Sequence, residues 1–250
     1  MEQITSIKNP RVQLWRSLKD RRARLETGLF LVEGFKSVRD ALASSFEPSV
    51  LLATEEALPA LTPPAGVPVA LLPEHVLAAV CDTKTPQGVA AVMRMRAATV
   101  AGPRLIALDG VQDPGNVGTI LRTADAAGFS GVLLSRDCAD PYAPKTLRAT
   151  MGSVFHVPFE ICEDLAGALA ARRAEGFAVL SAELDGTPFA RYRAGGRPLV
   201  LVIGSEGNGV SPAVRAVADE HLSLPMRGGA ESLNAAVAAG ILMYALMEEA

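Results

Sequence analysis

The stretch Leu199–Gly240, LVLVIGSEGNGVSPAVRAVADEHLSLPMRGGAESLNAAVAAG, contains the pattern that decides the fold. Its apolar run at 199–203 ends in the glycine loop 204–209, and a second short run at 221–224 ends at a proline. An alanine-rich helix is expected from Ala235 onward. Short apolar runs that end in glycine loops are typical of buried parallel strands, and open α/β sheets bind ligands at the carboxyl ends of such strands.

Three polar side chains interrupt this apolar stretch: Glu206, Ser232 and Asn234. Each has an ordinary interpretation, because a glycine loop forms tight turns and Ser or Asn caps helices. Their positions after two predicted strands favour a ligand site instead. The glycine spacing, GxxGxG, differs from the GxGxxG of dinucleotide-binding loops, and the chain has no GxxxxGK[ST] phosphate loop. A nicotinamide-dependent oxidoreductase is therefore disfavoured.

A second glycine-rich loop follows the predicted strand 105–108 and reads DGVQDPGNVG from Asp109 to Gly118. Asn116 lies near the start of the helix expected at 119–127, where it fits a helix cap or a site residue. Arg122 lies in that largely apolar helix. A cation in such surroundings is expected to have an anionic partner, either a phosphate or Glu206.

Composition and charge are those of a globular protein, with 49% hydrophobic residues, 20% charged residues and a formal net charge of −3. The three cysteines are widely spaced, and with only three histidines we expect no disulfide framework and no metal site. The polar N-terminus and the lack of an uninterrupted apolar run of about 18 residues predict a cytoplasmic protein that does not associate with membranes.

The first 96 residues predict a small α/β domain with a basic start. Strands are expected at 29–32, 50–53, 67–72 and 88–93, with helices at 8–26, 35–44 and 55–61. Basic residues outnumber acidic ones in residues 1–39, which fits either a solvated helix face or contacts with an RNA backbone. The basic residues are Lys8, Arg11, Arg16, Lys19, Arg21, Arg22, Arg24, Lys36 and Arg39.

The small, uncharged stretch 97–103 is the predicted linker, and 104–250 the predicted second domain. Apolar strands alternate with helices there, which indicates a parallel sheet covered on both faces. Strands are expected at 105–108, 131–134, 154–159, 177–181, 199–203 and 221–224, and helices at 119–127, 143–151, 164–175 and 235–247.

Taken together, three motifs resemble those of the SpoU (TrmH) family of SPOUT RNA 2′-O-ribose methyltransferases. They are the N-x-G-x-x-x-R pattern of Asn116 and Arg122, the IGSEGNG loop, and the SLN helix start at Ser232. They occur in the family's order and cover the chain from Leu105 to its C-terminus. The first domain resembles, more loosely, the family's RNA-binding domain, which is similar to ribosomal kink-turn-binding proteins.

The resemblance implies a SPOUT-type parallel sheet with a C-terminal deep trefoil knot, and S-adenosylmethionine as the methyl donor. It assigns donor binding and catalysis to separate groups of residues. The catalytic group is Asn116, Arg122, Glu206, Ser232 and Asn234. The donor-binding group is Ile203, Gly204, Gly209, Leu224, Met226 and Leu233.

The implied reaction is attack of a ribose 2′-hydroxyl on the methyl group of the donor. A literal arginine base is physically difficult because guanidinium stays protonated above pH ~12. We therefore expect Arg122 to steady the developing alkoxide and the neighbouring phosphate.

The resemblance also implies a homodimer formed through the catalytic domain. Ribosomal RNA is favoured over transfer RNA as the substrate. A non-catalytic RNA-binding protein remains the alternative from another functional class.

Overall fold

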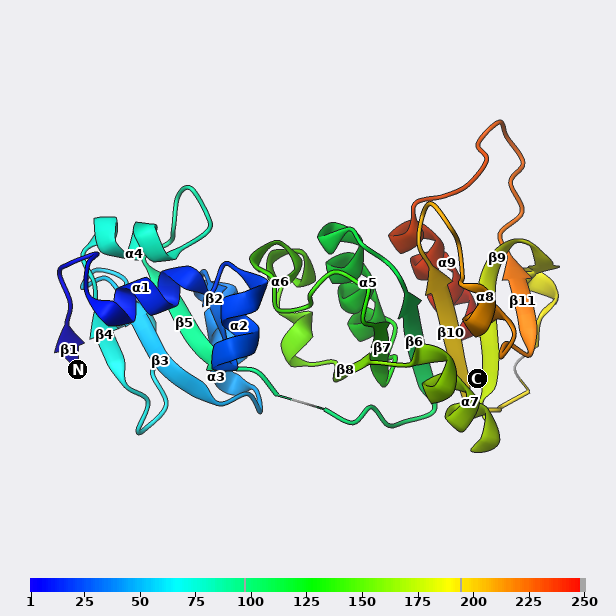
Figure 1. Ribbon diagram of the computed structural model, residues 1–250, viewed down its shortest axis with the longest axis horizontal. Coiled ribbons are helices and arrows are strands. Elements are labelled where there is room, and N and C mark those ends of the chain that lie inside the picture. The colour runs from blue at the N-terminus through cyan, green and yellow to red at the C-terminus, as the bar shows by residue number, and fades with distance from the viewer. Residues whose placement is uncertain (97, 194, 248–250) are drawn as a thin grey trace. The chain divides into compact units, whose positions relative to one another are not determined.

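The computed structural model describes residues 1–96, 98–193 and 195–247 and divides into two compact units. Figure 1 shows the chain coloured from its N-terminus to its C-terminus. The first unit contains residues 1–96 together with Asp140–Phe155, and the second contains 98–139 and residues from His156 onward. A segment from within the predicted second domain therefore folds with the first unit. The assignment of functions to the two predicted domains stays a prediction.

The first unit is built on a five-stranded sheet in the order β1-β4-β3-β5-β2. β3 runs parallel to β4 and antiparallel to β5, which also pairs antiparallel with β2. The strands are β1 (Glu2–Gln3), β2 (Leu29–Glu33), β3 (Pro48–Ala53), β4 (Val69–Leu71) and β5 (Val89–Arg94). The helices are α1 (Pro10–Ser17), α2 (Arg21–Thr27), α3 (Phe35–Ala43), α4 (Glu74–Val80) and α6 (Pro144–Thr150), with short 3-10 turns η1 (Leu58–Ala60) and η2 (Ser153–Phe155).

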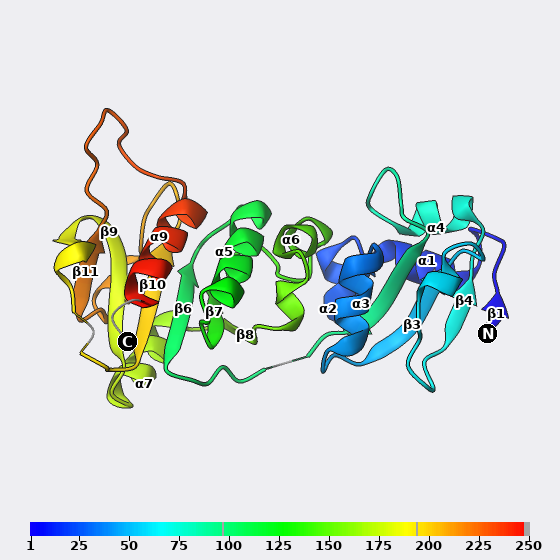
Figure 2. The same ribbon diagram turned by 180° about the vertical axis from the view of Figure 1, so that it is seen from behind.

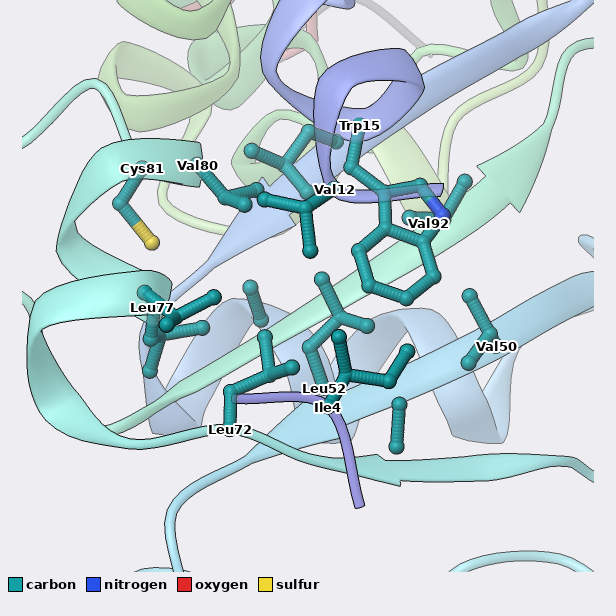
Figure 3. Close-up of a cluster of buried hydrophobic side chains, with 14 of the residues drawn as sticks. Ile4, Val12, Trp15, Val50, Leu52, Leu72, Leu77, Val80, Cys81 and Val92 are labelled. Carbon is teal, nitrogen blue, oxygen red and sulfur yellow. The ribbon is translucent and has the colours of Figure 1, made fainter. Parts of the chain in front are cut away.

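Apolar side chains from α1, α4 and one face of this sheet form a core, drawn in Figure 3. Val12 and Trp15 of α1 lie beside Leu77 of α4 and Leu52 of β3 in that cluster. All four are almost fully buried. Burial of large apolar side chains contributes roughly 1.5–3 kcal/mol each, so this cluster holds the two helices on the sheet.

Two predictions for the first unit differ from the structure. The single helix expected at 8–26 is two helices, because the chain turns between Leu18 and Asp20 before α2 begins. The helix expected at 55–61 is only the 3-10 turn η1, since Pro59 in its middle lacks the amide hydrogen that a longer helix needs.

The second unit contains a six-stranded, wholly parallel sheet in the order β11-β9-β10-β6-β7-β8. The strands are β6 (Arg104–Asp109), β7 (Gly131–Ser135), β8 (Phe159–Cys162), β9 (Ala178–Pro188), β10 (Leu199–Gly204) and β11 (Glu220–Ser223). The helices are α5 (Pro114–Ala126), α7 (Leu165–Ala174), α8 (Pro212–Arg215) and α9 (Ala235–Met247), with the 3-10 turn η3 (Phe189–Arg191). The predicted α/β class with a parallel sheet is confirmed.

Helices cover both faces of this sheet. α7 and α8 contribute Leu169 and Val214 to a cluster with Val200, Val202 and Leu105 of the central strands. On the other face, α5 packs against β7 and α9 packs against β10, and the two helices contact each other. A long loop joins β11 to α9 in both ribbon views (Figures 1 and 2).

The strand expected at 154–159 is displaced toward the C-terminus, to β8. Val154 and Phe155 are buried as expected of a strand, but they lie in the 3-10 turn η2 of the first unit. Phe155 packs there against Phe30 and Phe46. No helix in the described part of the chain is long and apolar enough to cross a membrane.

Candidate donor pocket and catalytic cluster

The first two motif loops leave the sheet side by side because β6 and β10 are neighbours. Gly204, the last residue of β10, pairs with Asp109, the last residue of β6. The Asp109 carboxylate also accepts a hydrogen bond of 2.6 Å from the backbone amide of Ser211, where the glycine loop ends. Strand register and this side-chain contact together bring the two loops to one edge of the sheet.

The loop from Gly204 to Gly209 folds tightly back on itself. Ser205 and Gly209 exchange two backbone hydrogen bonds, of 3.0 and 2.9 Å. A Cβ atom on Gly204 would lie 2.1 Å from the carbonyl carbon of Gly209. Gly209 itself adopts a φ of +65°, which L side chains rarely adopt. Both glycines are therefore required by the backbone geometry of the loop.

A chain of side-chain hydrogen bonds connects all three motifs. The amide nitrogen of Asn116, in the first turn of α5, donates to the carboxylate of Glu206. The amide nitrogen of Asn234 donates to the Oδ1 of Asn116 over 2.9 Å. Because a carboxylate only accepts, it fixes which end of each amide donates along the chain. Three of the five predicted catalytic residues are thus in direct contact.

Two of these residues also have structural roles. The Oδ1 of Asn234 caps α9 by accepting from the backbone amides of Ala236 and Val237, at 3.0 and 3.2 Å. The cap of α5 is Asp113, whose carboxylate accepts from the backbone N–H of Asn116, so the helix-cap interpretation of Asn116 is wrong. Asn234 is both a cap and a member of the polar chain.

A pocket of about 600 Å³ is lined by residues of β9, by the loops that follow β10 and β11, and by α9. This volume is within the usual range for small-molecule sites. All six predicted donor-binding residues line it, together with the catalytic candidates Glu206 and Ser232. Much of the remaining lining is apolar, from Leu222 and Leu242, with backbone from the glycine loop.

The charged side chains on the pocket wall are all acidic. Glu183, Asp185 and Glu206 line the pocket, and no lysine or arginine is among the described residues that do so. Such a wall repels the pyrophosphate of a dinucleotide and attracts cations. Nor do the residues described contain a group of three or more His, Cys, Asp or Glu side chains that could hold a metal ion.

Arg122 and Ser232 make no side-chain contacts with the polar chain. Arg122 is exposed on α5, and within the described residues it has no hydrogen-bond or ion-pair partner, so Glu206, one of the two anions predicted for it, is not its partner in the structure. Ser232 lies in the loop before α9 and faces the pocket. An unpaired, exposed guanidinium leaves its donors available to an anionic ligand.

Sequence reasoning missed the acidic wall contributed by the end of β9. Glu183 and Asp185 follow the buried part of that strand, and the guanidinium of Arg215 lies 3.5 Å from each carboxylate. The signal was available, because these acids come directly after the predicted strand 177–181, at a carboxyl end of the parallel sheet.

Comparisons with known proteins identify the class of this fold and site. Residues 103–244 match the SpoU rRNA Methylase family, and residues 9–91 match the MRM3-like substrate binding domain. The chain belongs to the SpoU rRNA methylase family.

Similar proteins span nearly the whole chain. The Bacillus subtilis 23S rRNA (guanosine(2553)-2′-O)-methyltransferase RlmP is 40% identical over 98% of this chain and 99% of its own. The AdoMet-bound rRNA methyltransferase from Sinorhizobium meliloti is 34% identical, with a TM-score of 0.89 over 98% of this chain and 97% of its own.

The SpoU methyltransferase AviRb from Streptomyces viridochromogenes, in complex with AdoMet, is 29% identical. Its TM-score is 0.85 over 96% of this chain and 98% of its own. The predictions of family, enzyme class and methyl donor are confirmed by these comparisons.

Proposed function

We propose that this protein transfers a methyl group from S-adenosylmethionine to a ribose 2′-hydroxyl of 23S ribosomal RNA. We further propose that the target is the guanosine for which the B. subtilis relative is named, because the two proteins are 40% identical over nearly the full length of both chains. The observation that carries the proposal is the convergence of all three motifs on one pocket and one polar chain.

The pocket suits the proposed donor. Ile203, Leu224, Met226 and Leu233 offer apolar surface for a neutral purine, and the backbone of the glycine loop offers donors and acceptors for its ring nitrogens. The acidic wall complements the positive charges of the sulfonium and α-ammonium groups. Once bound, the donor supplies an activated methyl group with its own leaving group.

The protein's part in the reaction is to position and stabilise. We propose that Arg122 binds the phosphate beside the target ribose and stabilises the alkoxide as it develops. Asn116, Glu206 and Asn234 hold one another in a fixed geometry, and Ser232 adds a hydroxyl at the pocket rim. The hydroxyl proton would pass to a phosphate oxygen, water or another side chain.

The proposed fold includes the deep trefoil knot. The sheet order supports it, because β11 lies beyond β9 while the following helix α9 returns to β10 and α5. The chain that makes the third motif must therefore cross back over the strands that carry the second. The first predicted domain, residues 1–96, is proposed to bind structured RNA in the manner of kink-turn-binding proteins, with residues 104–250 as the catalytic domain.

The proposed assembly is a homodimer through the catalytic domain. An exposed apolar stripe supports it, formed by Val237, Ile241 and Tyr244 at helical spacing along α9, each 41–50% exposed. Thr123 of α5 faces Gly240 of α9, so the helix that carries Arg122 packs against the helix that carries this stripe. In the proposed dimer, the Arg122 of one subunit would lie near the pocket of the other. An rRNA substrate supports a cytoplasmic location for the enzyme.

The deciding experiment maps 2′-O-methyl groups on ribosomal and transfer RNA from cells with the gene, without it, and with it restored. The proposal expects one 23S rRNA guanosine to lose its methyl group and regain it on complementation. Loss of a 2′-O-methyl group from tRNA instead would show that the substrate is tRNA. No change in either RNA, with donor binding absent in calorimetry, would favour a non-catalytic RNA-binding protein.

A further inference from the structure

We propose that Glu183 makes the donor pocket selective for positive charge. The pocket would then bind S-adenosylmethionine more tightly than S-adenosylhomocysteine, the product whose sulfur is neutral. This inference rests on the proposed function and adds a specificity-determining residue outside the three motifs.

Glu183 is placed to act strongly because its carboxylate is shielded from water. Its side chain is 10% exposed, whereas that of Asp185, two residues along the same strand, is 78% exposed. A charge in a partly buried site interacts with a ligand through a lower effective dielectric and with less screening by salt. Of the two carboxylates on this strand, Glu183 is therefore expected to dominate.

The neighbouring cation leaves this negative charge incompletely neutralised. Arg215 is the ion-pair partner of both Glu183 and Asp185, each at 3.5 Å, and its side chain is 46% exposed. Two carboxylates thus share one guanidinium, which leaves a net negative charge. The Ser181 hydroxyl, which also bonds to Nδ1 of His221 over 2.7 Å, lies 3.3 Å from the Glu183 carboxylate.

This arrangement has a consequence for turnover. The carboxylate keeps its charge throughout the reaction, while the ligand loses one positive charge when its methyl group is transferred to the ribose oxygen. The Coulomb attraction between wall and ligand therefore falls at that moment. The negative charge of Glu183 would therefore favour both binding of the methyl donor and release of the neutral-sulfur product.

The test measures the affinities of the full-length protein for S-adenosylmethionine and S-adenosylhomocysteine by calorimetry. In Glu183→Gln, the dissociation constant for S-adenosylmethionine should rise ~10-fold, while that for S-adenosylhomocysteine changes by less than ~2-fold. Sinefungin, which carries a protonated amine close to the position of the sulfonium, should behave like the donor.

A second variant tests the sign of the effect. Arg215→Gln removes the opposing positive charge, so it should raise the preference for the donor over the product by ~2-fold. Glu163→Gln is the matched control, because Glu163 is an exposed carboxylate whose partner is Arg136 and it does not line the pocket. In Glu163→Gln, the ratio of the affinities for S-adenosylmethionine and S-adenosylhomocysteine should stay at its wild-type value.

The possible results separate the two proposals. Equal weakening of both ligands by Glu183→Gln, or an unchanged ratio of the two affinities in both Glu183→Gln and Arg215→Gln, would overturn charge selection by Glu183. Wild-type protein that binds neither ligand would instead overturn the proposed function.

Discussion

The side-chain amide of Asn234 donates to the Oδ1 of Asn116 over 2.9 Å, joining residues 118 positions apart in the sequence. Asn234 also caps α9 with its own Oδ1. One residue therefore couples the start of the last helix to the first motif and, through Asn116, to Glu206. The polar chain and the cap of α9 both depend on this side chain, and substitution can separate the two roles.

Asn234→Asp should separate the two roles. Aspartate keeps the oxygen that caps α9 but loses the amide donor and adds a second carboxylate near Glu206. We expect methyl transfer to fall ~100-fold while the free energy of unfolding changes by less than ~0.5 kcal/mol. Asn234→Ala should lose ~1 kcal/mol as well, because the cap is gone. Thermal unfolding and kcat should be measured together. A wild-type kcat in Asn234→Asp would show that the hydrogen bond donated by the Asn234 side chain to Asn116 plays no part in the mechanism.

Arg122→Ala should abolish methyl transfer without weakening donor binding. Arg122 is exposed and does not line the pocket, so its removal leaves the proposed donor-binding residues intact. We expect a loss of at least ~100-fold in kcat, the size seen when one charge-stabilising donor is removed. Arg122→Lys should recover only part of the rate, since lysine lacks the planar fork of arginine. Single-turnover assays with calorimetry check both statements, and transfer at the wild-type rate would contradict them.

Gly204→Ala should damage the pocket, while Gly207→Ala in the same loop should be tolerated. A Cβ on Gly204 meets the backbone of Gly209 and Val210 at 2.1–2.3 Å, whereas one on Gly207 meets nothing within 4 Å. Because the obstacle is backbone, the loop itself must shift, at ~1–3 kcal/mol. Calorimetry should show at least ~10-fold weaker donor binding for Gly204→Ala alone. Equal affinities of the two variants for the methyl donor would show that the loop accommodates the added Cβ at little cost.

Arg24→Met should destabilise the first unit strongly. The Arg24 guanidinium bonds to the Asp140 carboxylate at 2.6 Å and to the carbonyls of Leu18 and Lys19, with only 3% of its side chain exposed. Removing it leaves a poorly solvated carboxylate and two unpaired carbonyls, which costs ~3 kcal/mol. Arg22→Met breaks only the exposed pair with Glu26, so it should change stability by less than ~0.5 kcal/mol. Denaturant titration compares the two, and similar midpoints would refute the difference.

Asp219 should contribute stability that is lost in acid. Burial alone would raise the pKa of its carboxyl, but the backbone amide of Val179 and the guanidinium of Arg173 hold that pKa below its usual value of 3.8. The contribution is therefore present above pH 3.8 and disappears as pH falls through the lowered folded-state pKa. Asp219→Asn should lose ~1 kcal/mol at neutral pH. That difference from wild type should vanish in strong acid, and a pH-independent difference would contradict the assignment.

Much of the fold was predictable because its signals are local. Five of the six strands of the parallel sheet begin within one residue of their predicted starts, since each begins with a short apolar run, although β9 continues to Pro188, well past its predicted end at 181. The strand expected at 154–159 failed for a non-local reason: Val154 and Phe155 are apolar because they serve the core of the other unit. Sequence periodicity cannot distinguish a buried turn from a buried strand over so short a run.

The candidate site was predictable where motif residues adjoin strand ends. Asn116, Glu206 and Asn234 are in contact, and the six predicted donor-binding residues share one pocket. The contribution of β9 was missed because the strand was predicted to end at residue 181, whereas it continues to Pro188 and carries Glu183 and Asp185 to the pocket. Of the two anionic partners predicted for Arg122, a phosphate and Glu206, the Glu206 carboxylate is bonded to Asn116 instead.

The position of β11 beyond β9 also bears on how the enzyme is made. The pocket takes residues from Ala182 to Leu242, and the strand that closes the edge of the sheet is the last to be synthesised. On the ribosome, a nascent chain that has reached β10 holds two motifs but cannot yet bind the donor. Because domains fold in the order of their emergence, the first unit would fold before the pocket is complete. Each new molecule would become active only after its final helix has emerged.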